Sequence, residues 1–105
     1  MMLSTRFPLA GLYRVEVSGW DQNQAFFVEK SELEWNEESG KRVALTNAVP
    51  DGAVIFLRLL QSLSADRSHP VPYEAEFLAE TSEGHRQFRL HPVSPRTVER
   101  VRLIN

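Results

Sequence analysis

Hydrophobic and polar residues alternate along several short stretches of this chain. Clear examples are residues 13–18, 42–46 and 73–80, where valine, tyrosine, phenylalanine, leucine or alanine positions are separated by charged or polar ones. A period of two with many β-branched and aromatic residues indicates β-strands that bury one face. Residues 26–35 and 85–90 continue the same pattern. We therefore expect an all-β chain.

Residues typical of turns separate these stretches. Pro50-Asp51-Gly52 is the clearest turn, because proline suits the second position of a β-turn. Gly19 is expected to end the first strand, and Pro92 and Pro95 to stop strand pairing. The other expected turns and loops are residues 20–24, 36–40, 61–72 and 83–84. The count is about six or seven strands, which predicts a small antiparallel β-barrel with a short C-terminal helix or turn that opens at Ser94.

The stretch from Ala53 to Leu60 is apolar on both faces, with Arg58 as its interruption. A small barrel fills its interior from one face of each strand, so the outer face needs a cover. Two covers are compatible with the sequence, namely residues 94–104 or the same face of a second copy in a homodimer. Trp20 lies in a polar loop, where an exposed tryptophan suits an interface. The candidate interface residues are therefore Trp20, Val54 and Phe56.

Composition fits one soluble domain over residues 1–105. The formal net charge is −2 and the chain has no cysteine, which removes disulfides and thiolate chemistry. Neither a signal peptide nor a continuous apolar span of membrane length is evident, so we expect a cytoplasmic protein without membrane insertion. The charges are uneven, with five Glu and one Lys in residues 29–38 and five Arg and one Glu in residues 85–105.

No catalytic motif stands out. The acidic residues 29–38 have no histidine or aspartate at ligand spacing, and we interpret them as a solvated strand face with no metal. We expect no enzyme activity and no cofactor. The C-terminal arginines suit phosphate groups, yet the aromatic platform of a single-strand binder is thin. A nucleotide or nucleic-acid module that uses these arginines is the alternative to a protein-interaction module.

The order of strands and turns resembles the PilZ domain, the bacterial receptor module for cyclic-di-GMP. The resemblance covers roughly residues 6–90 and depends on residues 15–19, the strand pair around Phe27 and Val43, and the 50–52 turn before an apolar strand. It implies a β-barrel with a nucleotide site built from an R-x-x-x-R motif and a D/N-x-S-x-x-G motif. Another small β-barrel or a sandwich is compatible with the same pattern.

The nucleotide-binding residues that this resemblance implies are mostly absent. Aligned on Gly40, the Asp/Asn position of the second motif falls on Trp35 and the Ser position on Glu37, and no arginine lies four residues after Arg6. Binding of cyclic-di-GMP is therefore not expected, and a protein partner or homodimer is. The candidate ligand-binding residues are Arg6, Arg14, Gly40, Arg86 and Arg89.

Overall fold

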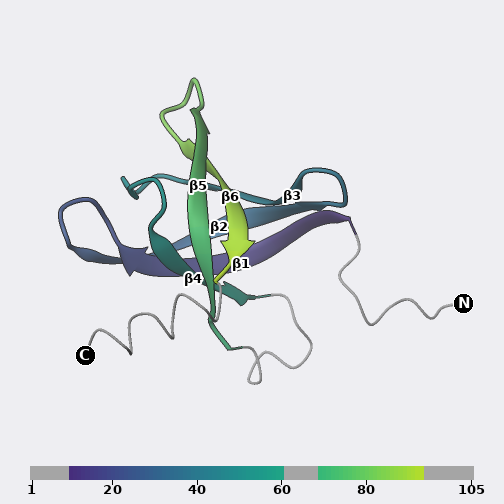
Figure 1. Ribbon diagram of the computed structural model, residues 1–105, viewed down its shortest axis with the longest axis horizontal. Helices are drawn as coiled ribbons and strands as arrows, with labels where there is room; N and C mark the ends of the chain where they lie inside the picture. The colour runs from purple at the N-terminus through teal and green to yellow at the C-terminus, as the bar shows by residue number, and fades with distance from the viewer. Residues whose placement is uncertain (1–9, 61–68, 94–105) are drawn as a thin grey trace, which may run out of the picture.

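A computed structural model of the chain describes residues 10–60 and 69–93. These residues form six strands and no helix, in the order β1 (Gly11–Trp20), β2 (Phe26–Asn36), β3 (Gly40–Leu45), β4 (Val54–Leu59), β5 (Val71–Glu80) and β6 (Arg86–Pro92). All neighbouring strands are antiparallel, and they close into a barrel in the order β1-β2-β3-β6-β5-β4 (Figure 1). The predicted all-β barrel is confirmed.

The barrel is built from hairpins that cross steeply. The long β1–β2 ribbon runs across the molecule, and the β5–β6 hairpin stands nearly upright against it (Figure 1). β1 and β2 pair along their whole length, from Gly11 opposite Trp35 to Trp20 opposite Phe26. β1 also pairs with β4, from Val15 opposite Leu59 to Ser18 opposite Phe56, and this contact closes the barrel.

The core consists of inward positions of the strands and of Val49, which lies between β3 and β4. Twelve of the described hydrophobic residues are buried, and none of the described polar or charged residues is. Strand alternation accounts for the other eleven, since a strand directs every second side chain to one face. The twelve buried residues are Val15, Val17, Phe27, Leu33, Val43, Leu45, Val49, Ile55, Leu57, Ala75, Phe88 and Leu90.

Three strand ends differ from the sequence expectation. Trp20 follows Gly19 within β1, so Gly19 lies inside the strand rather than at its end. Pro72 and Pro92 are both paired, opposite Phe56 and Tyr73 respectively. Proline lacks an N–H donor, but its carbonyl still accepts a hydrogen bond and its fixed φ lies at the edge of the β region.

Gly19 leaves room where β1 and β4 approach each other. A Cβ atom at this position would lie 3.3 Å from Ile55 Cγ2. The smallest residue therefore lets the two strands meet closely in the buried interior. The predicted C-terminal helix or turn, and residues 94–104 as a cover, lie outside the described residues.

The turn before β4 is held against β5. Gly52 N–H donates to the Ala75 carbonyl at 2.7 Å, and Ala75 N–H donates to the Ala53 carbonyl at 2.8 Å. Phe77 N–H donates to Asp51 Oδ1 at 2.8 Å, beside an irregularity of the β5–β6 register at Phe77 and Ala79. Because β4 pairs with β5 only as far as Val54 opposite Glu74, the Asp51 carboxylate supplies an acceptor for an N–H of β5 that has no strand partner on the β4 side.

Candidate functional site

An apolar patch covers the outer face of β1, β2 and β4. The register places Ser18 between Val28 on β2 and Phe56 on β4. Trp20, two residues further along β1, is opposite Phe26 and continues the same row toward Val54. We call these apolar residues the β1–β2–β4 patch, which consists of Trp20, Phe26, Val28, Val54 and Phe56.

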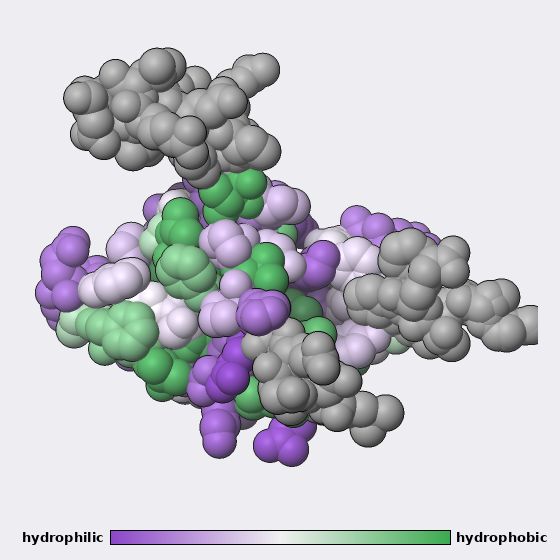
Figure 2. Space-filling view, turned by 90° about the horizontal axis from the view of Figure 1, so that it is seen from below, coloured by the Kyte–Doolittle hydropathy of each residue, from purple (hydrophilic) through white to green (hydrophobic). Residues whose placement is uncertain are grey.

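The patch is unusually exposed for its composition. Trp20 is 50% exposed, Phe26 57% and Val28 55%. The rings of Trp20 and Phe26 pack edge to face at 5.1 Å between centroids, so they form one rigid projection. Viewed from below, hydrophobic residues gather on the side where the β1–β2 hairpin extends (Figure 2). Contiguous apolar surface of this kind marks interaction sites.

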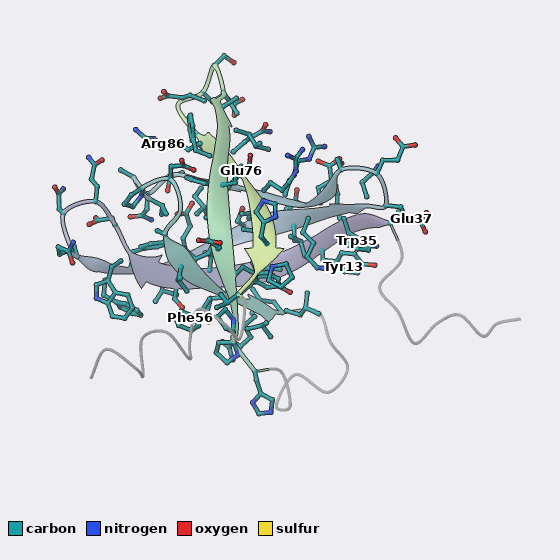
Figure 3. The ribbon with its side chains drawn as sticks, viewed as in Figure 1. Tyr13, Trp35, Glu37, Phe56, Glu76 and Arg86 are labelled. Atoms are coloured by element: carbon teal, nitrogen blue, oxygen red, sulfur yellow. The ribbon has the colours of Figure 1, made fainter. Side chains whose placement is uncertain are left out.

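The structure therefore brings the three sequence-predicted interface residues to one surface. Phe56 lies on the underside of β4 and points away from the barrel (Figure 3). Phe26 and Val28 belong to the same surface but were absent from the sequence prediction. Both residues alternate with buried Phe27, and this pattern in the sequence could have placed them on the outer face. Their position opposite Trp20 and Ser18 of β1 depends on the register of the hairpin, which only the structure shows.

A small cavity opens at the other end of the β1–β2 ribbon. Its volume is about 190 Å³. Tyr13 and Trp35, which both line it, lie side by side near the turn that carries Glu37 (Figure 3). We call it the mouth pocket, and it is lined by Tyr13, Leu33, Trp35, Lys41, Leu57, Leu59, His69, Val71 and Tyr73.

One lysine sits among the aromatic rings of the mouth pocket. Lys41 Nζ lies 4.2 Å from the centroid of the Trp35 ring and 5.8 Å from that of Tyr73. Both distances lie in the range of cation–π attraction. Burial raises the pKa of the Tyr73 phenol, because the charged phenolate is poorly solvated in this apolar setting. The pocket therefore combines an apolar wall with one fixed positive charge.

The candidate ligand-binding residues do not form one cluster. Gly40 begins β3 at the turn after β2, with φ of 79°, whereas Arg14 lies on β1 opposite Glu32. Arg86 lies near the β5–β6 turn, where its guanidinium stands 5.7 Å from the Phe77 ring centroid. Arg6 lies outside the described residues.

Among the candidates that the structure describes, Arg89 comes near Gly40. Its Nε donates to the Ser39 carbonyl at 3.1 Å, and its Nη1 lies 3.6 Å from Glu76 Oε1. Arg42, which sequence reasoning missed, is opposite Arg89 and pairs with Glu34 at 3.1 Å. Its buried Nε has no hydrogen-bond partner among the described residues. The pairing of β3 with β6 brings these arginines together.

The acidic stretch 29–38 is only partly the solvated face that the sequence indicates. Glu29 turns toward the loop after β3, where Oε2 accepts from Thr46 N–H at 2.7 Å and Oε1 accepts from Asn47 Nδ2 at 2.7 Å. Within residues 10–60 and 69–93, no three metal-ligating side chains gather. The same residues include no helix of the length and hydropathy that a membrane crossing requires.

Comparison with known proteins finds no matching family model, no matching curated protein and no matching solved structure. The β1–β2–β4 patch and the mouth pocket are therefore the features of the molecule that bear on its function.

Proposed function

We propose that this chain is a non-enzymatic interaction or regulatory module of the bacterial cytoplasm, a PilZ-like barrel that docks a second copy of itself through the β1–β2–β4 patch. The observation that carries the proposal is the contiguous exposure of Trp20, Phe26 and Val28 beside Val54. Burying each such side chain contributes roughly 1.5–3 kcal/mol, which favours docking over exposure.

The closed barrel restricts how a partner can bind. Every strand has hydrogen-bonded neighbours on both sides, although residues 26–32 of β2 and 76–80 of β5 have a partner strand on one side alone. Most of the surface that a partner can reach therefore consists of side chains on the outer face rather than of unpaired strand edges. Aromatic residues are the anchors that such surfaces use most, and Trp20 with Phe26 supplies a paired anchor.

The charges around the patch favour a second copy as the partner. Lys30 lies at one corner, next to Val28 along the outer face of β2, and Glu74 lies at the opposite corner, paired with Val54. A two-fold axis in the interface exchanges these corners, so that Lys30 of each copy faces Glu74 of the other. Such complementarity fixes orientation in an isologous dimer.

The alternative module for nucleotides or nucleic acids has less support. Of the C-terminal arginines, Arg89 pairs with Glu76 at 3.6 Å, which reduces the positive charge that phosphate groups would meet. The Arg86 guanidinium lies 5.7 Å from the Phe77 ring centroid, and the arginines after residue 93 lie outside the described residues. Trp35, at the Asp/Asn position of the PilZ motif, lines the mouth pocket. Its indole offers no acceptor for a guanine edge.

Sedimentation equilibrium at micromolar concentration tests the dimer. We expect a species of about twice the 12.0 kDa chain mass, and a monomer when Trp20→Ser and Phe56→Ser are combined. Leu12→Ser is the matched control, because Leu12 is an exposed hydrophobic residue of β1 outside the patch, and it should leave the dimer intact. A monomeric wild type, or a double variant that dimerises as well as wild type, overturns the proposal.

Calorimetric titration with cyclic-di-GMP tests the expected loss of nucleotide binding. We expect no heat of binding at micromolar ligand. Binding with a dissociation constant below roughly 10 µM that is abolished in Arg6→Ala would show that the nucleotide site is intact. The protein would then be a nucleotide receptor rather than an interaction module.

A further inference from the structure

The mouth pocket has about the volume that a single aromatic ring needs. Its volume is about 190 Å³, and apolar cavities of about 150 Å³ already bind benzene. Inward residues of five strands, β1 to β5, form its wall together with His69. A compact apolar group therefore fits it, whereas a dinucleotide does not.

Lys41 breaks the pattern of its own strand. It shares the inward face of β3 with Val43 and Leu45, which are both buried. An inward position at a barrel end usually carries a hydrophobic residue, yet here an ammonium group lies over Trp35. A purely structural explanation is that the methylene groups of the lysine pack on the indole while its ammonium group reaches water.

Among the described residues, the ammonium group of Lys41 has no carboxylate within ion-pair distance, whereas Arg42 and Arg58 both have glutamate partners. A charge that is partly desolvated without a counter-ion is stabilised by any anion that reaches it. A cationic ligand is disfavoured, because it would compete with Lys41 for the Trp35 and Tyr73 rings.

We propose that the mouth pocket binds a small amphipathic monocarboxylate, in which a single aromatic or branched aliphatic group carries the carboxylate. The apolar group packs against Tyr13, Trp35 and Tyr73, and the carboxylate pairs with Lys41. The pocket lies at the opposite end of β1 from Trp20. The proposal is therefore independent of docking through the β1–β2–β4 patch.

Benzoate and benzyl alcohol, two ring compounds of similar size, provide the direct test. Titration of isotope-labelled protein at pH 7, followed by backbone and side-chain NMR shifts, should give a benzoate dissociation constant near 1 mM. The shifts should be confined to the mouth pocket, including the Trp35 indole N–H. Benzyl alcohol should bind about tenfold more weakly, because it lacks the charge that pairs with Lys41.

Substitution of the lysine distinguishes a binding role from simple packing. Lys41→Gln should weaken benzoate about tenfold and leave benzyl alcohol unchanged, so that the preference between the two probes disappears. Arg42→Gln, which removes the neighbouring positive charge from the outer face of β3, should change neither affinity.

Three results would overturn the proposal. The first is the absence of NMR shifts at 10 mM benzoate, a concentration well above the expected dissociation constant. The second is equal affinity of the wild-type protein for benzoate and benzyl alcohol. The third is a preference for benzoate over benzyl alcohol that is unchanged in Lys41→Gln. The second comparison uses the wild-type protein alone, so it decides the matter even if Lys41→Gln fails to fold. None of these measurements depends on whether the protein is a dimer.

Discussion

At the scale of single residues, Gly40 is a position where backbone conformation decides the choice of amino acid. Its φ of 79° lies in the left-handed region, and a Cβ atom there would meet nothing within 4 Å. The cost of a side chain is therefore conformational rather than steric. Glycine therefore serves the turn between β2 and β3.

Gly40→Ala is expected to lower the free energy of unfolding by about 1–2 kcal/mol, because alanine is strained at positive φ. Urea denaturation followed by circular dichroism measures this change. Glu38→Ala, in the same turn, is the control and should lie within about 0.5 kcal/mol of wild type, since the hydrogen bond from Glu38 to Asn36 uses its backbone N–H. Equal effects of the two substitutions would contradict the conformational explanation.

Glu76 links β5 to β6 through its carboxylate. His91 Nε2 lies 2.8 Å from Glu76 Oε1, and Arg89 Nη1 lies 3.6 Å from the same oxygen. The hydrogen bond to His91, with the Arg89 charge, holds the pKa of Glu76 below its ordinary value. A depressed pKa contributes stability above the ordinary glutamate pKa, and that contribution is lost as the pH falls through the folded pKa.

His91→Ala should raise the pKa of Glu76 toward the ordinary value, because the strongest interaction with the carboxylate is removed. A side-chain NMR titration between about pH 2 and 6 spans the range in which glutamate ionises and measures the shift. His85→Ala removes a histidine outside this group and should leave the Glu76 titration as in wild type. An unchanged Glu76 pKa in His91→Ala would exclude His91 as the cause.

Alternation along the chain predicted many of the side chains that enter the core, but Phe77, two residues after buried Ala75, is 38% exposed beside the shift in the β5–β6 register. Val15, Val17 and Leu45 were placed inward by a period of two, and all are buried. The same pattern could not place Arg42 beside Arg89, because partners across strands depend on which strands pair. The mouth pocket was missed for the same reason, since five strands that are distant in sequence supply its wall.

At the scale of elements, β2 leaves β3 soon after the turn. The two strands pair from Asn36 opposite Gly40 only as far as Leu33 opposite Val43. Beyond that point β2 continues along β1 while β3 pairs with β6. Ser31 Oγ, which donates to the Ala44 carbonyl at 2.6 Å, and the Glu29 carboxylate bridge the region where the strands separate.

Glu29→Ala should destabilise the fold by about 2 kcal/mol, because it removes charge-assisted hydrogen bonds to Thr46 and Asn47. Thermal unfolding monitored by circular dichroism provides the comparison. Glu32→Ala, on the outer face of the same strand, is the control and should have little effect. If both variants unfolded at the same temperature as wild type, the hydrogen bonds of Glu29 would not contribute to stability and Glu29 would belong to the solvated face.

Strand positions were more predictable than strand neighbours. The turn signals at 36–40 and 50–52 lie where the chain reverses, and β4 follows the second of them. Contact between β3 and β6 or between β1 and β4 joins segments separated by more than thirty residues. Such pairs depend on barrel closure, which alternation within one strand does not encode.

At the scale of the whole molecule, closure of the barrel separates two populations of hydrophobic residues. Those on the inner face form the buried core, whereas Trp20, Phe26 and Val28 lie exposed on the outer face. The outer residues contribute little to the stability of a monomer, since they are already exposed in it. Their contribution belongs to association, which is why the proposed dimer and the fold can be tested separately.

A leucine-to-alanine substitution at an inner and at an outer position tests whether these two groups of residues contribute differently to stability. Leu45 is fully buried, whereas Leu12 is 62% exposed. Leu45→Ala should cost about 2–5 kcal/mol, because it removes buried methyl groups and leaves a cavity in a core that closes on all sides. Leu12→Ala should stay within about 0.5 kcal/mol of wild type.

Urea unfolding with a common m-value gives both free energies on one scale. A loss of about 2–5 kcal/mol is a large share of the total stability of a small domain, so Leu45→Ala should unfold at a clearly lower urea concentration than wild type, while Leu12→Ala should unfold at the wild-type concentration. Comparable losses at the two positions would mean that Leu12 is covered in solution. In that case the outer surface of β1 beyond the patch would also be part of an interface.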